Sequence, residues 1–253
     1  MRRLSAALCC LVLAAAAHAE WTVTSSESEA SSVSALNHKH VVLANTGTGA
    51  SVVVDLAVFA GDTVTLRLID NPDGANSLAD AMRNGTCIAG VNGGYFDEQF
   101  APLGLRVVDG KTLSPLRRAA LLTGVLVQSA RGVQILRRGE LSRSETRRAA
   151  VQCGPLLVDL ARPVRGLEGT REARRTFAAT TAKGRAAIGC SSEVSLAELG
   201  AILAGDVGGE RFQRALNLDG GSSTAFWFRR KTGAPVSIAE QKPVRDFVGL
   251  APK

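Results

Sequence analysis

The sequence is poor in aromatic and histidine side chains. Aromatic residues make up 4% of the 253 residues, with one tyrosine, Tyr95. Histidine occurs at three positions, His18, His38 and His40. So few aromatic rings can provide few surfaces on which sugars or bases stack. The sequence also has no basic motif interleaved with aromatic residues, which nucleic-acid binding would need. We therefore predict that the chain does not bind nucleic acid.

Long hydrophobic runs are also missing, apart from one at the N-terminus. Met1-Arg2-Arg3 is followed by apolar residues from Leu4 to Ala17 and by Ala17-His18-Ala19, which is typical of a signal peptide and its cleavage site. The run is too short for a membrane anchor, and Cys9 and Cys10 lie inside it, which disfavours a lipoprotein. We predict a signal peptide over 1–19 and one domain over 20–253. The mature chain is expected to be periplasmic or secreted, without stable membrane insertion.

Cysteine is sparse, and no C-x-x-C pair is present, which argues against a thiolate zinc site. Three cysteines remain after cleavage: Cys87, Cys153 and Cys190. An oxidising compartment allows one disulfide and one free thiol. We favour Cys153 with Cys190, because both lie in strand-like runs beside proposed loops, but the sequence permits any of the three pairings.

Charge is moderately basic. Loss of residues 1–19 removes Arg2 and Arg3 but no acidic residue, which leaves 28 basic and 23 acidic side chains, a net charge of +5. Most of the excess is arginine, whose planar guanidinium suits phosphate and carboxylate. Arg106, Arg174, Arg175 and Arg245 lie near proposed loops and are candidates for such a contact.

Strand-like segments outnumber helical ones. Leu196–Ala204 is predicted to be a helix because Ser195 and Glu198 form a capping box and the apolar residues share one face. Shorter helices are predicted over Ser77–Arg83, with Gly85 as a left-handed stop, and near Glu210–Arg214. The fold class is therefore α+β, with mixed, mainly antiparallel sheets. The predicted strands are His38–Leu43, Ser51–Phe59, Thr63–Ile69, Thr86–Val91, Leu105–Val108, Leu121–Gln128, Val133–Leu136, Val151–Leu160, Thr176–Thr181, Arg185–Cys190, Leu216–Leu218, Ala225–Phe228 and Val244–Leu250, while residues 22–35 are either a loose arm or an edge strand.

Two glycine-rich loops follow short apolar runs. They are Asn92-Gly93-Gly94-Tyr95-Phe96 and Asp219-Gly220-Gly221-Ser222-Ser223. Paired glycines allow unusual backbone angles, and successive N–H groups can form a nest for an anion such as phosphate. Both loops could instead be simple tight turns. The polar residues at both strand ends favour a binding site, with Ser222 and Ser223 as additional donors.

The histidine positions disfavour a serine hydrolase. Only His38 and His40 remain in the mature chain, both far in sequence from Ser222 and Ser223, and Gly220–Thr224 lacks the G-x-S-x-G pattern. The two histidines share a strand face and could hold a metal, but no third ligand is evident, and we predict no metal site. Acid–base chemistry is then expected from carboxylates. Asp219 is the first candidate, although it could merely cap a turn; possible partners are Asp97, Glu98, Asp109, Asp159 and Asp246.

Five segments resemble the phosphodiester glycosidase family. Asn92–Phe96 is similar to its N-G-G-[FY]-F element, and 216–223 (LNLDGGSS) to its L-N-L-D-G-G-[GS]-S element. Gly154-Pro155-Leu156-Leu157-Val158, Arg175-Thr176 and Lys242-Pro243-Val244 resemble three further elements, in the same order along the chain. Two departures are Lys242 in place of arginine and Thr176-Phe177-Ala178 in place of T-A-I-G.

The resemblance implies an exported hydrolase that cuts a sugar-1-phosphodiester, such as an envelope or exopolysaccharide glycan, between the anomeric carbon and the phosphate oxygen. It implies catalytic roles for Asn92, Arg175 and Asp219, and substrate contacts from Gly93, Gly94, Tyr95, Thr176, Gly220, Gly221, Ser222 and Ser223. The expected ligand is a phosphorylated glycan or a small sugar phosphodiester, and no particular cofactor is indicated. Two alternatives remain: a non-catalytic periplasmic glycan-binding protein, or a structural envelope protein in which the glycine loops are only turns.

Overall fold

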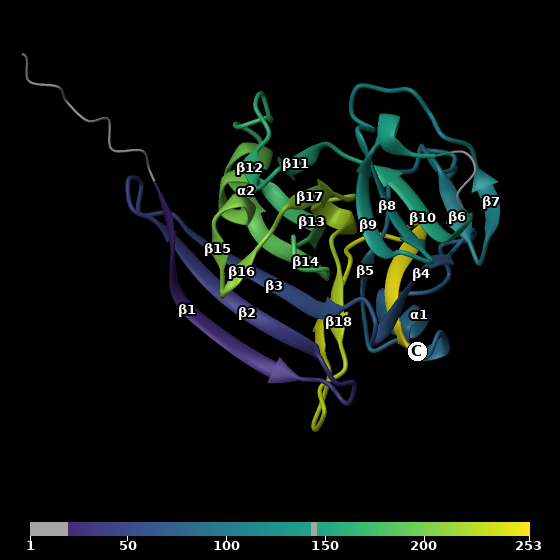
Figure 1. Ribbon diagram of the computed structural model, residues 1–253, viewed down its shortest axis with the longest axis horizontal. Coiled ribbons are helices and arrows are strands. Elements are labelled where there is room, and N and C mark those ends of the chain that lie inside the picture. Colours follow the sequence, from purple (N-terminus) through teal and green to yellow (C-terminus); the bar gives the residue numbers. More distant parts are fainter. Residues whose placement is uncertain (1–19, 143–145) are drawn as a thin grey trace, which may run out of the picture.

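The computed structural model describes residues 20–142 and 146–253 as three large antiparallel sheets, one two-stranded sheet and two α-helices (Figure 1). The predicted signal peptide lies outside the described residues. Every pairing between the described strands is antiparallel, which confirms the predicted α+β class with mainly antiparallel sheets.

The largest sheet has eight strands. In spatial order these are β1 (Trp21–Ala30), β2 (Leu36–Asn45), β3 (Ser51–Ala60), β14 (Arg185–Val194), β13 (Ala173–Thr180), β17 (Arg214–Asn217), β11 (Leu156–Asp159) and β12 (Arg162–Pro163). The polar, serine-rich segment after residue 20 is thus an edge strand, β1, and is almost wholly exposed. The central strands are buried on both faces, so apolar residues run continuously along β3 rather than alternating.

Two five-stranded sheets complete the body of the molecule. One contains β19 (Val236–Ile238), β18 (Phe226–Phe228), β5 (Ala89–Asn92), β20 (Asp246–Pro252) and β4 (Val64–Asp70). The other contains β7 (Lys111–Ser114), β6 (Arg106–Val108), β10 (Arg147–Cys153), β8 (Gly124–Ser129) and β9 (Gly132–Arg137). Figure 1 shows β1 to β3 on one side of the molecule and β8 to β10 on the other.

The main core lies where the three sheets meet. Phe59 on β3, Ile188 on β14, Val91 on β5, Phe226 on β18 and Val151 on β10 belong to one buried cluster. The opposite face of the large sheet is covered by α2 (Leu196–Ala204), whose Leu199 and Leu203 are fully buried. Residues far apart in sequence therefore converge on one core, from which the strand ends emerge.

Both longer helices begin as predicted. Ser195 Oγ accepts from Glu198 N at 3.2 Å, and Ser195 N donates to the Glu198 carboxylate. These two bonds confirm the capping box of α2. Ser77 caps α1 (Leu78–Asn84) in the same way. Gly85 is not in the left-handed region, however, because its φ is −80°; Thr86, with φ of 54°, takes that conformation instead.

Two sequence predictions of secondary structure are wrong. Val151–Leu160 is not one strand: it divides at Gly154-Pro155 into β10 and β11, which belong to different sheets. The segment near Glu210 is not a helix, because Gly208 and Gly209, with φ of 61° and 88°, form a tight hairpin turn. That turn joins two short strands, β15 (Asp206–Val207) and β16 (Glu210–Arg211).

The expected disulfide is not formed. Cys87, Cys153 and Cys190 are each a free, buried thiol in the part of the chain that the structure describes. Burial raises the pKa of Cys87 to about 11 and that of Cys153 to about 12. These thiols therefore stay protonated and act as small apolar side chains of the core.

Candidate active site

The two glycine-rich loops lie against each other. β5 delivers Asn92 at its C-terminal end, and β17 leads through Leu218 into Asp219. Asp219 N donates to Gly93 O at 3.0 Å, and Asn92 Nδ2 donates to Asp219 O at 2.7 Å. The fold thus brings together two segments that are separated by more than a hundred residues.

Asn92 is the junction between these loops and β13. Its side chain has no exposed surface. Asn92 Oδ1 accepts from Thr176 Oγ1 at 2.7 Å and from Ala225 N at 3.0 Å. Because all these partners belong to the protein, the Asn92 amide braces the site rather than facing solvent.

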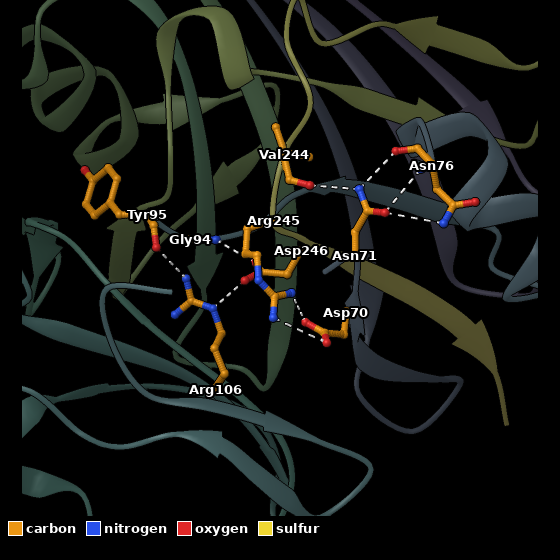
Figure 2. Close-up of polar contacts among 9 residues, drawn as sticks. All are labelled: Asp70, Asn71, Asn76, Gly94, Tyr95, Arg106, Val244, Arg245 and Asp246. Atoms are coloured by element: carbon orange, nitrogen blue, oxygen red, sulfur yellow. Dashed lines mark hydrogen bonds and ion pairs between the residues drawn. The ribbon is translucent and has the colours of Figure 1, made fainter. Parts of the chain in front are cut away.

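A buried ion pair holds the first loop in place (Figure 2). Asp246 and Arg106 are each 2% exposed, and Arg106 Nε donates to Asp246 Oδ2. The other carboxylate oxygen, Asp246 Oδ1, accepts from Gly94 N at 2.9 Å, and Asp246 O accepts from Gly93 N at 2.8 Å. Arg106 also donates to Tyr95 O at 3.1 Å. The pair therefore fixes three successive residues of the loop.

Close packing explains why this loop contains glycine. A Cβ on Gly93 would lie 1.7 Å from Asp246 Oδ1, and one on Gly94 would lie 2.3 Å from an Arg106 nitrogen. Neither glycine has a positive φ. The expectation that these two amides form an anion-binding nest is wrong, because both donate to Asp246.

Asp219 is partly buried at the start of the second loop. Its Oδ1 accepts from Gly220 N at 3.0 Å. Burial raises the pKa of the Asp219 carboxyl above its ordinary value, against the opposing effects of the Ser223 hydroxyl and the Lys242 charge. The Ser223 hydroxyl lies near this carboxyl but forms no hydrogen bond with any described residue. A raised pKa suits a carboxyl that gives or takes a proton near neutral pH.

The second loop offers donors that the first lacks. Gly221–Ser223 forms one 3₁₀ turn, η2, and its first N–H groups, on Gly221 and Ser222, find no acceptor among the described residues. Gly220, Gly221 and Ser222 are all partly exposed. The hydroxyls of Ser223 and Thr224 are buried without a hydrogen-bond partner.

Arg175 lies beside this loop, with its Cδ 3.7 Å from the position of a Cβ on Gly220. Arg175 Nε donates to Val194 O at 2.9 Å and Nη2 donates to Arg171 O. Burial lowers the pKa of Arg175, against the opposing effect of Glu168, but the group stays charged. The remaining nitrogen, Nη1, has no acceptor in the described part of the chain.

Tyr95 links the site to the break between β10 and β11. Its hydroxyl donates to Gly154 O at 2.6 Å and accepts from Asn217 Nδ2 at 2.8 Å. Burial raises the pKa of Tyr95 far above its ordinary value, so the phenol stays protonated. Tyr95 is a predicted substrate contact, but its hydroxyl is already engaged within the protein.

Comparison with known proteins identifies the family. Residues 85–251, well over half of the chain, match the phosphodiester glycosidase family. The chain belongs to the phosphodiester glycosidase family. The match begins before β5 and ends within β20, so it includes both glycine-rich loops and Arg175.

Solved structures with the same fold are distant in sequence. The catalytic domain of zebrafish N-acetylglucosamine-1-phosphodiester alpha-N-acetylglucosaminidase, auto-inhibited by its pro-peptide, is 14% identical, with a TM-score of 0.63 over 92% of this chain and 89% of that one. A hypothetical protein from Synechocystis is 15% identical, with a TM-score of 0.62 over 87% of this chain; this chain spans 62% of that protein. A Burkholderia pseudomallei protein designated as exported is 14% identical, with a TM-score of 0.59, over 82% and 75% of the two chains. No curated protein matches the sequence significantly.

The other carboxylates considered as partners of Asp219 are engaged elsewhere or exposed. Asp97 accepts from the backbone of its own loop, Asp109 lies exposed in the turn between β6 and β7, and Asp159 pairs with Arg137 and Arg214. Glu98 is exposed, and Asp246 is committed to Arg106. For this member of the family, Asp219 is therefore the carboxyl group that the structure leaves available at the junction.

The histidines take no part in the site. His38 Nε2 and His40 Nδ1 each lie 2.9 Å from Asp55 Oδ1. Within the described ranges, no cluster of three histidine, cysteine or acidic residues is arranged to bind a metal. None of the described helices has the length and apolar character needed to cross a membrane.

Sequence reasoning missed three contributors to the site. Asn217, within the L-N-L-D element, bonds Tyr95 and Gly154. Arg106 and Asp246 were noted only as a nearby arginine and a possible acid. Their pairing had no local signal, because 140 positions separate them.

Proposed function

We propose that this protein is an exported hydrolase that cleaves the glycosidic bond of a sugar-1-phosphodiester, giving free sugar and a phosphate monoester. The proposal rests on the partly buried carboxyl of Asp219. It lies in the same loop as the N–H groups of Gly221 and Ser222, which have no acceptor among the described residues, and this loop lies beside the guanidinium group of Arg175. Membership of the phosphodiester glycosidase family supports it. The apolar N-terminal segment supports export, as does the similarity to a bacterial protein designated as exported.

In this proposal the phosphate is bound by Arg175 Nη1 and by the N–H groups of Gly221 and Ser222. Charge-assisted hydrogen bonds of this kind are about twice as strong as neutral ones. The bond from the anomeric carbon to the phosphate oxygen breaks, and its electron pair stays on the phosphate. A phosphate monoester is a good leaving group, so protonation of its oxygen matters less than in an ordinary glycoside.

Asp219 then acts on water at the anomeric carbon. Its carboxylate accepts a proton as the water oxygen bonds to that carbon, and the proton later passes to solvent. Asn92 and Thr176 act as positioning residues, because their side chains hold Asp219 through its carbonyl and hold each other. Tyr95, Gly93 and Gly94 are likewise assigned to support of the loop.

The test uses methyl phosphodiesters of α-glucose, α-N-acetylglucosamine and α-N-acetylgalactosamine. We expect ³¹P NMR to show conversion of at least one diester to a monoester. Reaction in ¹⁸O water should place the label in the sugar and not in the phosphate. Label in the phosphate would overturn the proposed bond cleavage.

Asp219→Asn provides the test of the catalytic residue. Loss of the proton acceptor should lower kcat by about 10²–10⁴-fold. Asp62→Asn, an exposed turn residue, is the matched control and should keep full activity. Activity retained in Asp219→Asn would contradict the assignment, and binding of the diesters without any product would instead favour the glycan-binding alternative.

The melting temperature of Asp219→Asn should not fall at pH 7. Because the pKa of the Asp219 carboxyl is raised in the folded state, this carboxyl ionises at a lower pH in the unfolded chain than in the folded protein. Stability is therefore lost as pH rises from the unfolded to the folded pKa, and the cost persists above it. The neutral amide removes that cost, so lost activity with an unchanged or higher melting temperature separates chemistry from misfolding.

A further inference from the structure

Two adjoining cavities beside the candidate site are lined with arginine. The first, of about 610 Å³, and the second, of about 520 Å³, share Arg118, Arg138 and Gly139. The described residues that line them include five arginines, Arg117, Arg118, Arg137, Arg138 and Arg147, and one acidic residue, Glu140. We refer to them as the arginine cavities.

Most of this positive charge has no acidic partner among the described residues. Glu140 is held by both terminal nitrogens of Arg214, and Arg137 pairs with Asp159. No carboxylate of the described residues forms an ion pair with the other four arginines. The cavities therefore present four guanidinium groups that no carboxylate of residues 20–142 or 146–253 neutralises.

Arg147 adds a second, independent indication of a ligand. Its Nε and Nη2 atoms are buried and have no hydrogen-bond partner in the described structure. A buried donor that stays unpaired costs about 1–3 kcal/mol, and more when it is charged. An anion in the adjoining cavity would supply the missing acceptor.

The walls of the cavities are rigidly anchored. Gln152 on β10 has no exposed surface, and its Oε1 accepts from Arg117 N at 3.0 Å. Its Nε2 donates to Arg117 O at 2.8 Å and to Leu122 O at 3.2 Å. A single buried amide thus fixes the backbone that carries Arg117 and Arg118, so the guanidinium groups extend from a fixed base.

The first cavity shares a wall segment with the residues that support the candidate active site. Thr123 and Leu156 line the first cavity, and Leu156 N donates to Thr123 Oγ1 at 2.8 Å. Two residues before Leu156, Gly154 O accepts from Tyr95 OH at 2.6 Å. Leu156 also pairs with Leu216, three positions before Asp219, so the first cavity and the candidate site lie on neighbouring strands.

We infer that the arginine cavities bind the acidic groups of a glycan that continues beyond the scissile bond. The two cavities suit at least two negative charges, either carboxylates or phosphates, on neighbouring sugars. This inference rests on the proposed function and makes it more specific: the preferred substrate is an anionic glycan rather than a small neutral diester.

The experiment compares Arg118→Gln/Arg138→Gln with the matched control Arg162→Gln/Arg165→Gln. The first pair lines both cavities, whereas the second pair removes equal charge from an exposed segment elsewhere. Isothermal titration uses an oligogalacturonide, a neutral dextran oligosaccharide and a single-stranded oligodeoxynucleotide. Circular dichroism melting checks that both variants fold as the wild type does.

We expect the wild type and the control to bind the oligogalacturonide and not the dextran. The cavity variant should bind it about tenfold or more weakly, as the loss of charge-assisted hydrogen bonds implies. Equal loss in both variants would mean diffuse charge and overturn the inference. Absence of oligogalacturonide binding, or equally tight binding of the oligonucleotide, would also overturn it.

Turnover of a small methyl phosphodiester separates this inference from the proposed function. The cavity variant should hydrolyse that diester at the wild-type rate, because neither arginine contacts the loops around Asp219. If no diester is hydrolysed by any variant, the proposed function fails, while anion binding by the cavities is still decided by the titrations. Impaired hydrolysis of the small diester in the cavity variant alone would overturn the separation of the two sites.

Discussion

The two glycine-rich loops have similar sequences but opposite environments. In the first loop, residues 92–94 are buried, and the N–H groups of Gly93 and Gly94 donate to the buried Asp246. Its glycines are required by crowding, since a Cβ at Gly93 would lie 1.7 Å from Asp246. In 219–224, the first four residues are partly exposed. Gly221 has φ of +65° and open space where a Cβ would lie, so its glycine serves conformation instead.

The two loops therefore have different roles, although their sequences are similar. A loop whose donors are all engaged has nothing to offer a ligand, but it can hold its neighbours still. A loop with unpaired amides and hydroxyls can bind an anion. Gly-Gly alone therefore does not indicate a binding site; the partners of the amides do. Substitutions around the first loop should chiefly reduce stability, and those in the second should chiefly reduce turnover.

The largest effect on stability is expected from Asp246→Ala. The change leaves Arg106 charged and buried without its partner, and it removes the acceptor of Gly94 N. Breaking a buried pair in this way costs about 3–5 kcal/mol. Urea unfolding followed by circular dichroism should show that loss, and activity should fall because the loop is no longer held.

Asp246→Asn is the matched control for that prediction. It removes the charge but keeps an oxygen that can accept from Gly94 N, so its loss of unfolding free energy should be clearly smaller. Equal stability of the alanine variant and the wild type would show that the ion pair does not hold the loop.

A smaller effect is expected from Thr176→Val. The substitution removes the hydroxyl that donates to Asn92 Oδ1, while Ala225 N still donates to the same oxygen. The loss of one buried hydrogen bond should cost about 1 kcal/mol in urea unfolding. Thr180→Val on the same strand is the control, because no hydrogen bond is assigned to its side chain. An equal cost in both variants would mean that β13 responds to valine in general and not to the lost contact.

Sequence patterns correctly predicted the features that depend on interactions between residues close together in the chain. The cap of α2 depends on Ser195 and Glu198, three positions apart, and the structure has it as predicted. The strand break at Gly154-Pro155 was missed because the apolar run Val151–Leu160 continues on both sides of it. The helix predicted near Glu210 failed because Gly208 and Gly209 form a hairpin turn and commit the chain to strands.

That the segments of the candidate site converge was predictable, but their contacts were not. Resemblance to a family brought Asn92, Arg175 and Asp219 into one hypothesis, and the fold does place these segments together. Which amides are free depends on Asp246, a long-range partner that no pattern near Gly94 reveals. The disulfide was inferred from the compartment and from the position of two cysteines in strand-like runs, and the three buried thiols in the core do not form one.

The smallest predicted effect is a change in pH dependence and concerns the exposed loop. The positive charge of Lys242 lowers the pKa of Asp219, while burial raises it by more. Lys242→Met removes the favourable charge, so the pKa should rise further. Because we assign the working form to the carboxylate, activity is lost as the pH falls through this pKa. The acid limb of kcat/KM should therefore move to higher pH in the variant.

Lys231→Met is the control for this shift. Lys231 is also exposed and has no assigned interaction with Asp219, so its acid limb should coincide with that of the wild type. Raised salt should reduce the difference between wild type and Lys242→Met, since an exposed charge is screened. An unchanged acid limb together with a basic limb that moves to higher pH would mean that the protonated carboxyl is the working form. Asp219 would then act as an acid on the leaving phosphate, which would reverse the role proposed for the exposed loop while leaving that of the buried one unchanged.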